Sequence, residues 1–259
     1  MNIITACDAG FFHCLKELAK SVRKFYDKPV IVYDMGLTEE QKKTLDAVII
    51  PIQIDPAVNY TGKAYLAPNG NPSTRATHKP FCVQHYFANY SEPMIMVDAD
   101  CLFNERVEEK GFDVAVTYTP PRKGEQIHYY NGIINSGVIF FNTPAAELVN
   151  RWAQNCYQEN TTDQKALSDV LEETINWQEY KKMQQWDGLK IRIFNTKIYN
   201  DFHLTRKGKI LHFINTKHRE DIYEKLINER QKGRDIRKSF REIKRGKKSF
   251  MDRILGIFK

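Results

Sequence analysis

Short apolar runs alternate with amphipathic stretches along the first part of the chain. Residues 12–26 carry apolar side chains at the spacing of one helix face, which predicts an amphipathic helix. Residues 38–47 also have helical character, with Thr38 as the expected N-cap and Gln41 three positions later. The apolar runs around these helices predict strands at residues 3–6, 29–33 and 48–51. Strands that alternate with helices favour right-handed crossovers and a mainly parallel sheet, so we expect an α/β fold.

The alternation continues toward the middle of the chain. A helix is expected over residues 79–90, and strands over residues 94–97 and 112–118. Residues 55–74 are rich in Asn, Pro, Gly and Tyr and lack a period, so they are expected to form a long surface loop, and residues 120–131 a second one. No internal repeat is present, and no apolar run reaches the roughly 18 residues of a membrane-spanning helix.

Two aspartates separated by one residue follow the apolar run at 94–97. Open α/β sheets bind their ligands at the carboxyl ends of strands, where Asp98 and Asp100 are expected to lie. For both carboxylates to point at one spot, we expect the backbone to turn there. Adjacent negative charges are costly without a cation between them, and a divalent ion with open positions for phosphate oxygens meets that need. The alternative is that Asp98 or Asp100 caps the following segment.

A second motif consists of Asn135, Ser136 and Gly137, three small or polar residues beside a strongly β-prone run. Glycine in a strand often marks close approach by a ligand or by another backbone, and we expect this of Gly137. The alternative is that the three residues form only a turn between strands.

Two further positions combine a polar side chain with a regular element. Asp163 and Gln164 begin a helical stretch that runs through residue 171, although Thr162 or Asp163 alternatively serves only as its N-cap. His212 lies at the end of the apolar run at residues 209–213. A histidine in this position is either a ligand or a polar residue that is satisfied within the fold.

The composition is that of an ordinary globular protein. The chain has 259 residues, of which 42% are hydrophobic and 12% aromatic, which suits one large domain, alone or with an appendage. Five scattered cysteines without a Cys-x-x-Cys pair favour reduced thiols in a cytosol over a disulfide or zinc framework. The first residues lack the basic start and the apolar length of a signal peptide, so a cytoplasmic location is expected.

The net charge of +7 is concentrated near the C-terminus. Residues 201–259 hold 18 Lys and Arg against 8 Asp and Glu, whereas residues 1–200 hold 21 against 24. We expect a domain over residues 1–219 and a basic amphipathic tail over residues 220–259, helical from residue 222 to about residue 247. The apolar positions of this tail are Ile222, Leu226, Ile236, Phe240, Ile243, Phe250, Ile254, Leu255, Ile257 and Phe258.

Three roles are open to the basic tail. A basic, amphipathic segment with aromatic side chains suits the surface of an anionic bilayer, at the inner face of the membrane. Alternatively, the tail is a solvated helix that packs its apolar face on the domain. Nucleic-acid binding ranks last, because no aromatic stacking platform or groove-reading motif accompanies the charges, and no nucleic-acid partner is expected.

In their order and spacing, these motifs resemble the retaining glycosyltransferases of family 8, such as lipopolysaccharide galactosyltransferases and glycogenin. The resemblance extends from Ile3 to about Lys217. It implies the GT-A fold, a Rossmann-like, mixed and mainly parallel sheet flanked by helices. It further implies that Asp98, Asp100 and His212 bind Mn²⁺, or Mg²⁺, which grips the diphosphate of a nucleotide sugar.

The resemblance also assigns residues to the donor and to the reaction. The family's opening motif, which lines the nucleoside pocket, matches Thr5-Ala6-Cys7-Asp8, and the residues implied there are Thr5, Ala6 and Asp8. Asp163 and Gln164 match the pair that faces the donor sugar, and the catalytic role is implied for them. The remaining donor-binding positions implied by the resemblance are Arg75, Lys79, Asp98, Ala99, Asn135, Ser136, Gly137 and Lys217.

One segment departs from the family pattern. Family members usually have a glycine three residues after the histidine and a lysine six residues after it. Here Asn215 replaces the glycine, Lys217 comes one residue early, and His218 occupies the position of the lysine. A basic side chain near the β-phosphate is still expected, with Lys217 as the assigned residue.

The function that follows from the resemblance is metal-dependent glycosyl transfer. A UDP-sugar is the expected donor, a saccharide or glycolipid the expected acceptor, and retention the expected stereochemistry. The loops at residues 55–74 and 120–131 are the expected places for acceptor recognition, since loops carry specificity on such scaffolds. One alternative is a nucleotidyltransferase, which uses a similar sheet but usually a glycine-rich, basic phosphate loop after its first strand. Another is a non-catalytic, membrane-associated interaction module.

Overall fold

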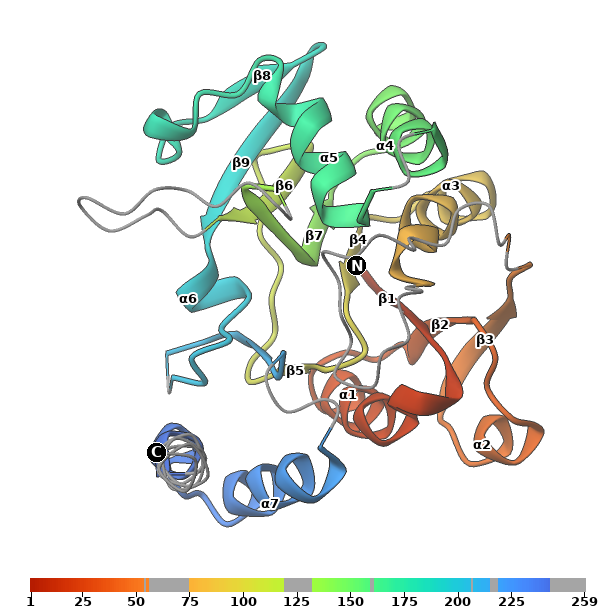
Figure 1. Cartoon of the computed structure of the whole chain (residues 1–259), viewed down its shortest axis with the longest axis vertical. Helices are drawn as coiled ribbons and strands as arrows, with labels where there is room; N and C mark the ends of the chain where they lie inside the picture. Colours follow the sequence, from red (N-terminus) through yellow and green to blue (C-terminus); the bar gives the residue numbers. More distant parts are fainter. Residues whose placement is uncertain are drawn as a thin grey trace, which may run out of the picture.

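In the computed structural model, a mixed sheet of eight strands lies at the centre of the part of the chain that is described (Figure 1). The structure describes residues 1–53, 55, 75–118, 132–158, 161–205, 207–214 and 219–242. The strand order is β3-β2-β1-β4-β7-β6-β9-β8, and β7 and β8 run antiparallel to the other strands. The strands of this sheet are β1 (Asn2–Cys7), β2 (Val30–Asp34), β3 (Ala47–Pro51), β4 (Met94–Val97), β6 (Val114–Tyr118), β7 (Ile134–Phe141), β8 (Gln184–Trp186) and β9 (Leu189–Asn195).

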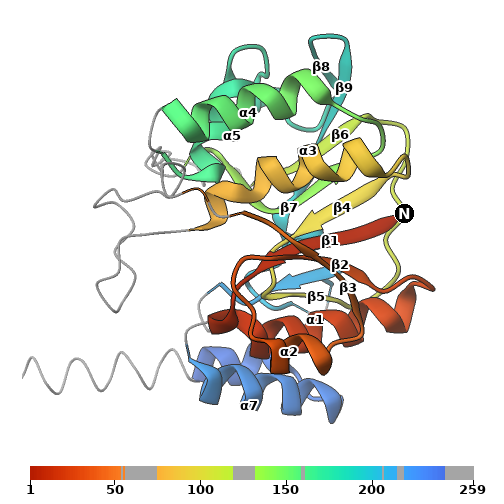
Figure 2. The ribbon, with the colours of Figure 1, turned by 90° about the vertical axis from the view of Figure 1, so that its right-hand side faces the viewer.

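Helices cover both faces of the sheet (Figure 2). The helices α3, α4 and α5 lie on one face, whereas α1 lies on the other, with α7 beyond it. Both faces are therefore buried, as expected of a sheet made mainly of parallel strands. The helices are α1 (Phe12–Phe25), α2 (Glu39–Lys43), α3 (Lys79–Asn89), α4 (Ala146–Gln158), α5 (Asp163–Glu172), α6 (Thr196–Tyr199) and α7 (Glu220–Gln231), with short 3₁₀ turns at Ala9–Phe11, Arg75–His78 and Trp177–Glu179.

The apolar strands show why two layers of helices are needed. In β4, Met94 and Met96 pack into the core under α3 and α4, while Ile95 and Val97 pack into the core under α1. All four side chains are fully buried. A strand with apolar residues on both faces is stable only where both faces are covered. This agrees with the buried strand that the sequence predicts at residues 94–97.

Most predicted elements of the first hundred residues are present, and one needs correction. Thr38 caps α2 through a capping box with Gln41, as predicted. The helix ends at Lys43, however, rather than extending to Ala47. Ala47 instead begins β3, where it pairs with Val30 of β2. The sheet ladder therefore takes Ala47, which local helix propensity alone would have added to α2.

A second, smaller sheet joins two segments that are far apart in sequence. It consists of β5 (Cys101–Phe103) and β10 (Ile210–His212), which pair antiparallel so that His212 lies opposite Cys101. Because Cys101 directly follows Asp100, this register brings His212 to the end of β4. The strand predicted at residues 209–213 is confirmed, and its partner explains its position.

Asn135, Ser136 and Gly137 lie inside strand β7, so the turn that we considered as an alternative is wrong. The register between β6 and β7 shifts at this point. Val116 lies opposite Ile139, whereas the next residue, Thr117, lies opposite Asn135. The residues between them on β7 form a bulge. Bulges re-aim side chains locally, and here the bulge lies beside the end of β4.

The continuous helix predicted from residue 222 to about residue 247 is interrupted. Helix α7 ends at Gln231, and Gly233 follows with a φ of 70°, in the left-handed region that favours glycine. Helical structure resumes over residues 236–242. None of the helices that the structure describes is long and apolar enough to cross a bilayer.

The apolar residues of this region pack on the body of the protein. Tyr223 and Leu226 of α7 lie in one cluster with Leu211 and Phe213, next to β10. Leu226 is fully buried. For residues up to 242, the alternative in which the helix packs its apolar face on the domain therefore holds. The positions that do so are Ile222, Leu226, Ile236 and Phe240.

Several predictions fall on residues outside the described ranges. They concern the two long loops, except for Asp55 of the first, and the segment that contains Asn215, Lys217 and His218. They also concern the last part of the tail, residues 243–259.

Candidate active site

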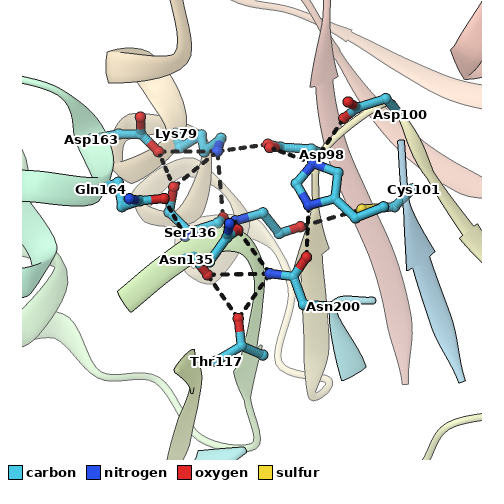
Figure 3. A network of polar contacts seen from close by, with 12 residues as sticks. Lys79, Asp98, Asp100, Cys101, Thr117, Asn135, Ser136, Asp163, Gln164 and Asn200 are labelled. Carbon is cyan, nitrogen blue, oxygen red and sulfur yellow. Dashed lines mark hydrogen bonds and ion pairs between the residues drawn. The ribbon is translucent and has the colours of Figure 1, made fainter. Parts of the chain in front are cut away.

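The chain turns immediately after β4, as expected if the two aspartates are to point at one spot. The backbone N–H of Cys101 donates to the carbonyl oxygen of Asp98 over 3.0 Å, which closes a tight turn. Ala99, inside the turn, is buried. The turn brings both carboxylates to one region at the carboxyl end of β4 (Figure 3), where the Asp98 side chain keeps 22% of its surface exposed and that of Asp100 only 3%.

His212 faces these two carboxylates. Its Nε2 lies 3.2 Å from Asp100 Oδ1 and 3.4 Å from Asp98 Oδ2. The ring is buried, and Nε2 has no hydrogen-bond partner among the residues that the structure describes. One ligand atom from each of the three residues lies within 4.8 Å of the others. Burial alone would lower the pKa of His212, but the charges of Asp100 and Asp98 outweigh burial and raise it.

The other ring nitrogen of His212 is fixed by Asn200, a residue that sequence reasoning did not single out. Nδ1 lies 2.6 Å from Asn200 Oδ1. The amide nitrogen of Asn200 donates to Thr117 Oγ1 and to Asn135 Oδ1, each over 2.8 Å. Asn200 follows α6, outside every predicted element, so no local pattern in the sequence indicated it.

Gly137 makes room for the histidine ring. A Cβ at this position would lie 2.2 Å from His212 Cε1 and 2.6 Å from Nδ1. Close approach at Gly137 was predicted, but of a ligand or a backbone, whereas the structure shows that a side chain fills the space. No residue with a side chain fits here unless His212 moves, so Gly137 contributes to the site by packing.

Lys79, the first residue of α3, is buried between two carboxylates (Figure 3). Its Nζ lies 2.6 Å from Asp98 Oδ1 and 3.0 Å from Asp163 Oδ2. Burial opposes the charged ammonium, but Asp163 and Asp98 more than compensate and raise the pKa of Lys79 well above its usual range. Asp98 therefore has one oxygen on Lys79 and the other toward His212.

The predicted Asn-Ser-Gly and Asp-Gln motifs meet at the same place. Ser136 Oγ donates to Asp163 Oδ2 over 2.7 Å, and Ser136 N donates to Gln164 Oε1 over 3.3 Å. Thr162 is the N-cap of α5, since its side chain accepts from Lys165 N. The capping alternative thus holds for Thr162, whereas Asp163 contacts Lys79 and Ser136.

The remaining donor-binding candidates lie near the ends of β1 and β2. Thr5 is fully buried and Ala6 partly buried in β1. Asp8 caps the turn Ala9–Phe11 by accepting from Gly10 N over 2.9 Å. Arg75 Nη1 lies 4.0 Å from Asp8 Oδ2 and donates to the carbonyl oxygen of Met35, just after β2. These residues form a second group, at the edge of the sheet where parallel strands place ligands.

The residues at the end of β4 fit a divalent cation. Two carboxylates and one imidazole nitrogen form a mixed oxygen and nitrogen donor set, which suits manganese. Lys79 pairs with Asp98 and Asp163, and Asp100 faces His212, so the contacting group has one ammonium against three carboxylates. With a neutral His212, a divalent ion balances the charge of this group. The buried Nε2 lies near two carboxylate oxygens and has no hydrogen-bond partner in the part of the chain that the structure describes, which favours an ion at this place.

Comparison with known proteins shows which solved structures have a similar fold. No protein-family profile matches the chain, and no curated protein matches its sequence. Among solved structures, an active-site mutant of LgtC has a TM-score of 0.50 at 14% identity, over 82% of this chain and 86% of that one. A glycosyltransferase involved in the glycosylation of the major capsid of PBCV-1 has a TM-score of 0.51 at 11% identity, over 85% of this chain and 97% of that one.

At these identities the likeness concerns the fold. The chain has the mixed, mainly parallel GT-A sheet of these glycosyltransferases, which confirms the fold class that the sequence predicts. The roles of the individual site residues remain predictions.

Replacing Lys79 tests the charge arrangement of the site. Lys79→Met removes the ammonium between Asp98 and Asp163 and leaves two buried or half-buried carboxylates without it. Because breaking a buried ion pair on one side leaves an uncompensated charge, we expect the free energy of unfolding to fall by about 3–5 kcal/mol. Urea denaturation at pH 7 without added metal measures this change.

Lys165→Met provides the matched control. Lys165 pairs with Asp169 one turn along α5, at the surface, where an ion pair contributes less than about 1 kcal/mol. Equal losses in the two variants would contradict the buried arrangement around Lys79.

Proposed function

We propose that this protein is a metal-dependent glycosyltransferase. It transfers a sugar from a nucleotide diphosphate sugar, with a UDP-sugar as the expected donor, to a saccharide or lipid-linked acceptor, with retention at the anomeric carbon. The fold is the one that glycosyltransferases such as LgtC use. The observation that carries the proposal is the convergence of Asp98, Asp100 and His212 Nε2 at the carboxyl end of β4.

Asp98, Asp100 and His212 are the proposed ligands of Mn²⁺ or Mg²⁺. When bound, such an ion supplies Lewis-acid stabilisation of a departing diphosphate. Lys79 lies next to this site and is held by Asp98 itself, so its ammonium is fixed before any donor arrives. A preorganised positive charge stabilises developing negative charge without reorganisation during the reaction. We assign Lys79 to the diphosphate or the adjoining sugar.

Asp163 and Gln164 differ in what their side chains contact. Asp163 is buried, and its carboxylate contacts Lys79 and Ser136. Gln164 is only partly buried, and its side-chain Oε1 accepts from the backbone N–H of Ser136. This difference supports Gln164 as the residue that faces the anomeric carbon, with Asp163 holding Lys79 and Ser136 in position.

The second group of candidates, near β1, is the proposed nucleoside end of the site. Thr5, Ala6, Asp8 and Arg75 lie at the carboxyl edge of the sheet, beside the strands that carry the ion site. A nucleotide diphosphate sugar that spans β1 and β4 would place its base near Asp8 and its phosphates near Asp100. We propose a nucleotide sugar and an acceptor saccharide as the two substrate classes of this chain.

Nucleotide binding tests the proposal directly. We expect UDP with Mn²⁺ to raise the melting temperature, and UDP without metal to have little effect, because a ligand that binds only the folded state stabilises it by mass action. At 100 times Kd the gain is about 2.7 kcal/mol, or roughly 5–10 °C for a chain of this size. Thermal unfolding with UDP, GDP or CDP, each with and without Mn²⁺, measures it.

Two variants make the experiment specific. Asp100→Asn keeps the volume of the side chain but removes its charge, and it should abolish the manganese-dependent shift. Asp46→Asn changes an exposed carboxylate that pairs with Arg23 and should leave the shift unchanged. If no nucleotide shifts the melting temperature of the unmodified chain, the transferase proposal fails and the interaction module becomes the better hypothesis.

We also propose that the end of the tail binds anionic membrane surfaces. Ile236 and Phe240 pack on the domain, so the apolar residues that remain for a membrane follow residue 242. Residues 243–259 hold 6 Lys and Arg against 1 Asp, together with the apolar positions from Phe250 to Phe258. A basic segment with apolar and aromatic side chains suits the interface of an anionic bilayer.

Truncation after Glu242 tests this assignment, since it removes the basic end and keeps the buried residues Ile236 and Phe240. Sedimentation with vesicles of phosphatidylcholine and phosphatidylglycerol should recover the full chain and lose the truncated one. Vesicles of phosphatidylcholine alone are the control and should recover neither. Equal recovery of both chains with the anionic vesicles would show that the tail is not the membrane-binding segment.

A further inference from the structure

We propose that Asn200 is a positioning residue of the ion site, which sets the tautomer and the orientation of His212. This inference rests on the proposed function, because it concerns how His212 serves the metal. Asn200 is fully buried, and its side chain contacts a proposed metal ligand and a strand that carries donor-binding candidates. Such partners of a metal-binding histidine commonly fix its ring and tune its affinity.

The hydrogen bonds of Asn200 leave only one orientation of its amide. Nδ2 donates to Thr117 Oγ1 and to Asn135 Oδ1, each over 2.8 Å. Asn135 Oδ1 also accepts from Gly137 N over 2.9 Å, so it is an acceptor toward both partners. An amide group whose nitrogen serves two acceptors must point its oxygen the other way. Asn200 Oδ1 therefore faces His212.

The orientation of Asn200 determines which nitrogen of His212 carries hydrogen. Asn200 Oδ1 can only accept, so His212 Nδ1, which lies 2.6 Å away, must donate. In a neutral imidazole the other nitrogen, Nε2, then has a free lone pair. Nε2 is the atom that faces Asp98 and Asp100. Asn200 thus presents the lone pair of His212 where the ion is proposed to bind.

Asn200 also completes a closed circuit of contacts around the site (Figure 3). Asp98 contacts Lys79, Lys79 contacts Asp163, and Asp163 accepts from Ser136. Asn135, next to Ser136 in β7, accepts from Asn200, which in turn accepts from His212, and His212 faces Asp98. Asn200 is the member of this circuit whose side chain joins His212 to Asn135 by hydrogen bonds.

Backbone contacts hold Asn200 and His212 together as well. His212 N donates to the carbonyl oxygen of Asp201, the residue after Asn200, over 3.1 Å. Asn200 N donates to the carbonyl oxygen of Thr196 over 3.0 Å, at the end of α6. The side chain therefore projects from a fixed backbone. Leucine at this position would supply neither the acceptor for His212 nor the donors, whereas aspartate would keep the acceptor alone.

Manganese binding by the full chain tests the proposal. Titration of Mn²⁺, followed by the electron paramagnetic resonance of the free ion, gives Kd without substrate or turnover. We expect Asn200→Leu to weaken Mn²⁺ binding by about 10- to 100-fold, as is typical when the outer partner of a metal ligand is lost. Asn200→Asp keeps an oxygen for the Nδ1 hydrogen and should bind Mn²⁺ at least about tenfold more tightly than Asn200→Leu.

Thr117→Val is the matched structural control. It removes the hydroxyl that accepts from Asn200 and donates to Asn135 O, but it leaves the contact between Asn200 and His212. We expect Thr117→Val to lower stability while keeping Kd for Mn²⁺ within about threefold of the unmodified chain, since the partner of the metal ligand is unchanged. Nitrogen-15 NMR of His212 with saturating Mg²⁺, assigned with His212→Gln, should show hydrogen on Nδ1 and none on Nε2.

The outcomes separate this proposal from the proposed function. If the unmodified chain binds no Mn²⁺, the ion site itself fails, and the role of Asn200 with it. If the unmodified chain binds Mn²⁺ and Asn200→Leu binds it equally well, only the role of Asn200 is overturned. Equal loss in Thr117→Val and Asn200→Leu overturns it too. If Asn200→Leu does not fold, hydrogen on Nε2 in the NMR spectrum of the unmodified chain overturns it.

Discussion

The pairing of β10 with β5 is the constraint on which the candidate site depends. It places His212 opposite Cys101, one residue beyond Asp100, although these segments are far apart in the sequence. The register sets the position of His212 along β10 relative to the end of β4, and Gly137 leaves the space into which its ring packs. Because a strand register shifts only in whole residues, a slip would turn His212 to the opposite face. The site therefore exists only when both sheets are formed.

The second constraint is the charge of the site, to which residues from both sheets contribute. One buried lysine, paired with Asp98 and Asp163, does not balance the three carboxylates of the site. His212 points a nitrogen toward two of them, Asp98 and Asp100. Burying charges in this way is costly unless they are paired. A divalent ion provides the missing positive charge in the proposed holoenzyme. The excess negative charge that is costly to bury is therefore also the feature that favours a divalent cation at this site.

The local part of this architecture was predictable from the sequence. Alternation of apolar runs and amphipathic stretches indicated the parallel sheet, and the capping box at Thr38 located a helix start. A turn after β4 was expected if Asp98 and Asp100 were to point at one spot, and the turn is present. These features depend on residues that are close together in the sequence, so a sequence pattern is enough to predict them.

The non-local part was not predictable in the same way. No local pattern indicated a role for Asn200, because its hydrogen-bond partners lie on β6, β7 and β10. Gly137 was singled out correctly as a site of close approach, but the approaching group depends on the pairing of β10. Ala47, which was expected in a helix, instead pairs with Val30 in the sheet. Tertiary contacts override local propensity at such places.

The position of a bound manganese ion tests the proposed metal site most directly. Crystals grown with Mn²⁺ and UDP, measured at the manganese absorption edge, locate the metal without reference to activity. We expect one anomalous peak in contact with carboxylate oxygens of Asp98 and Asp100 and with His212 Nε2. A peak that excludes His212, or bound UDP without a peak at the end of β4, would contradict it.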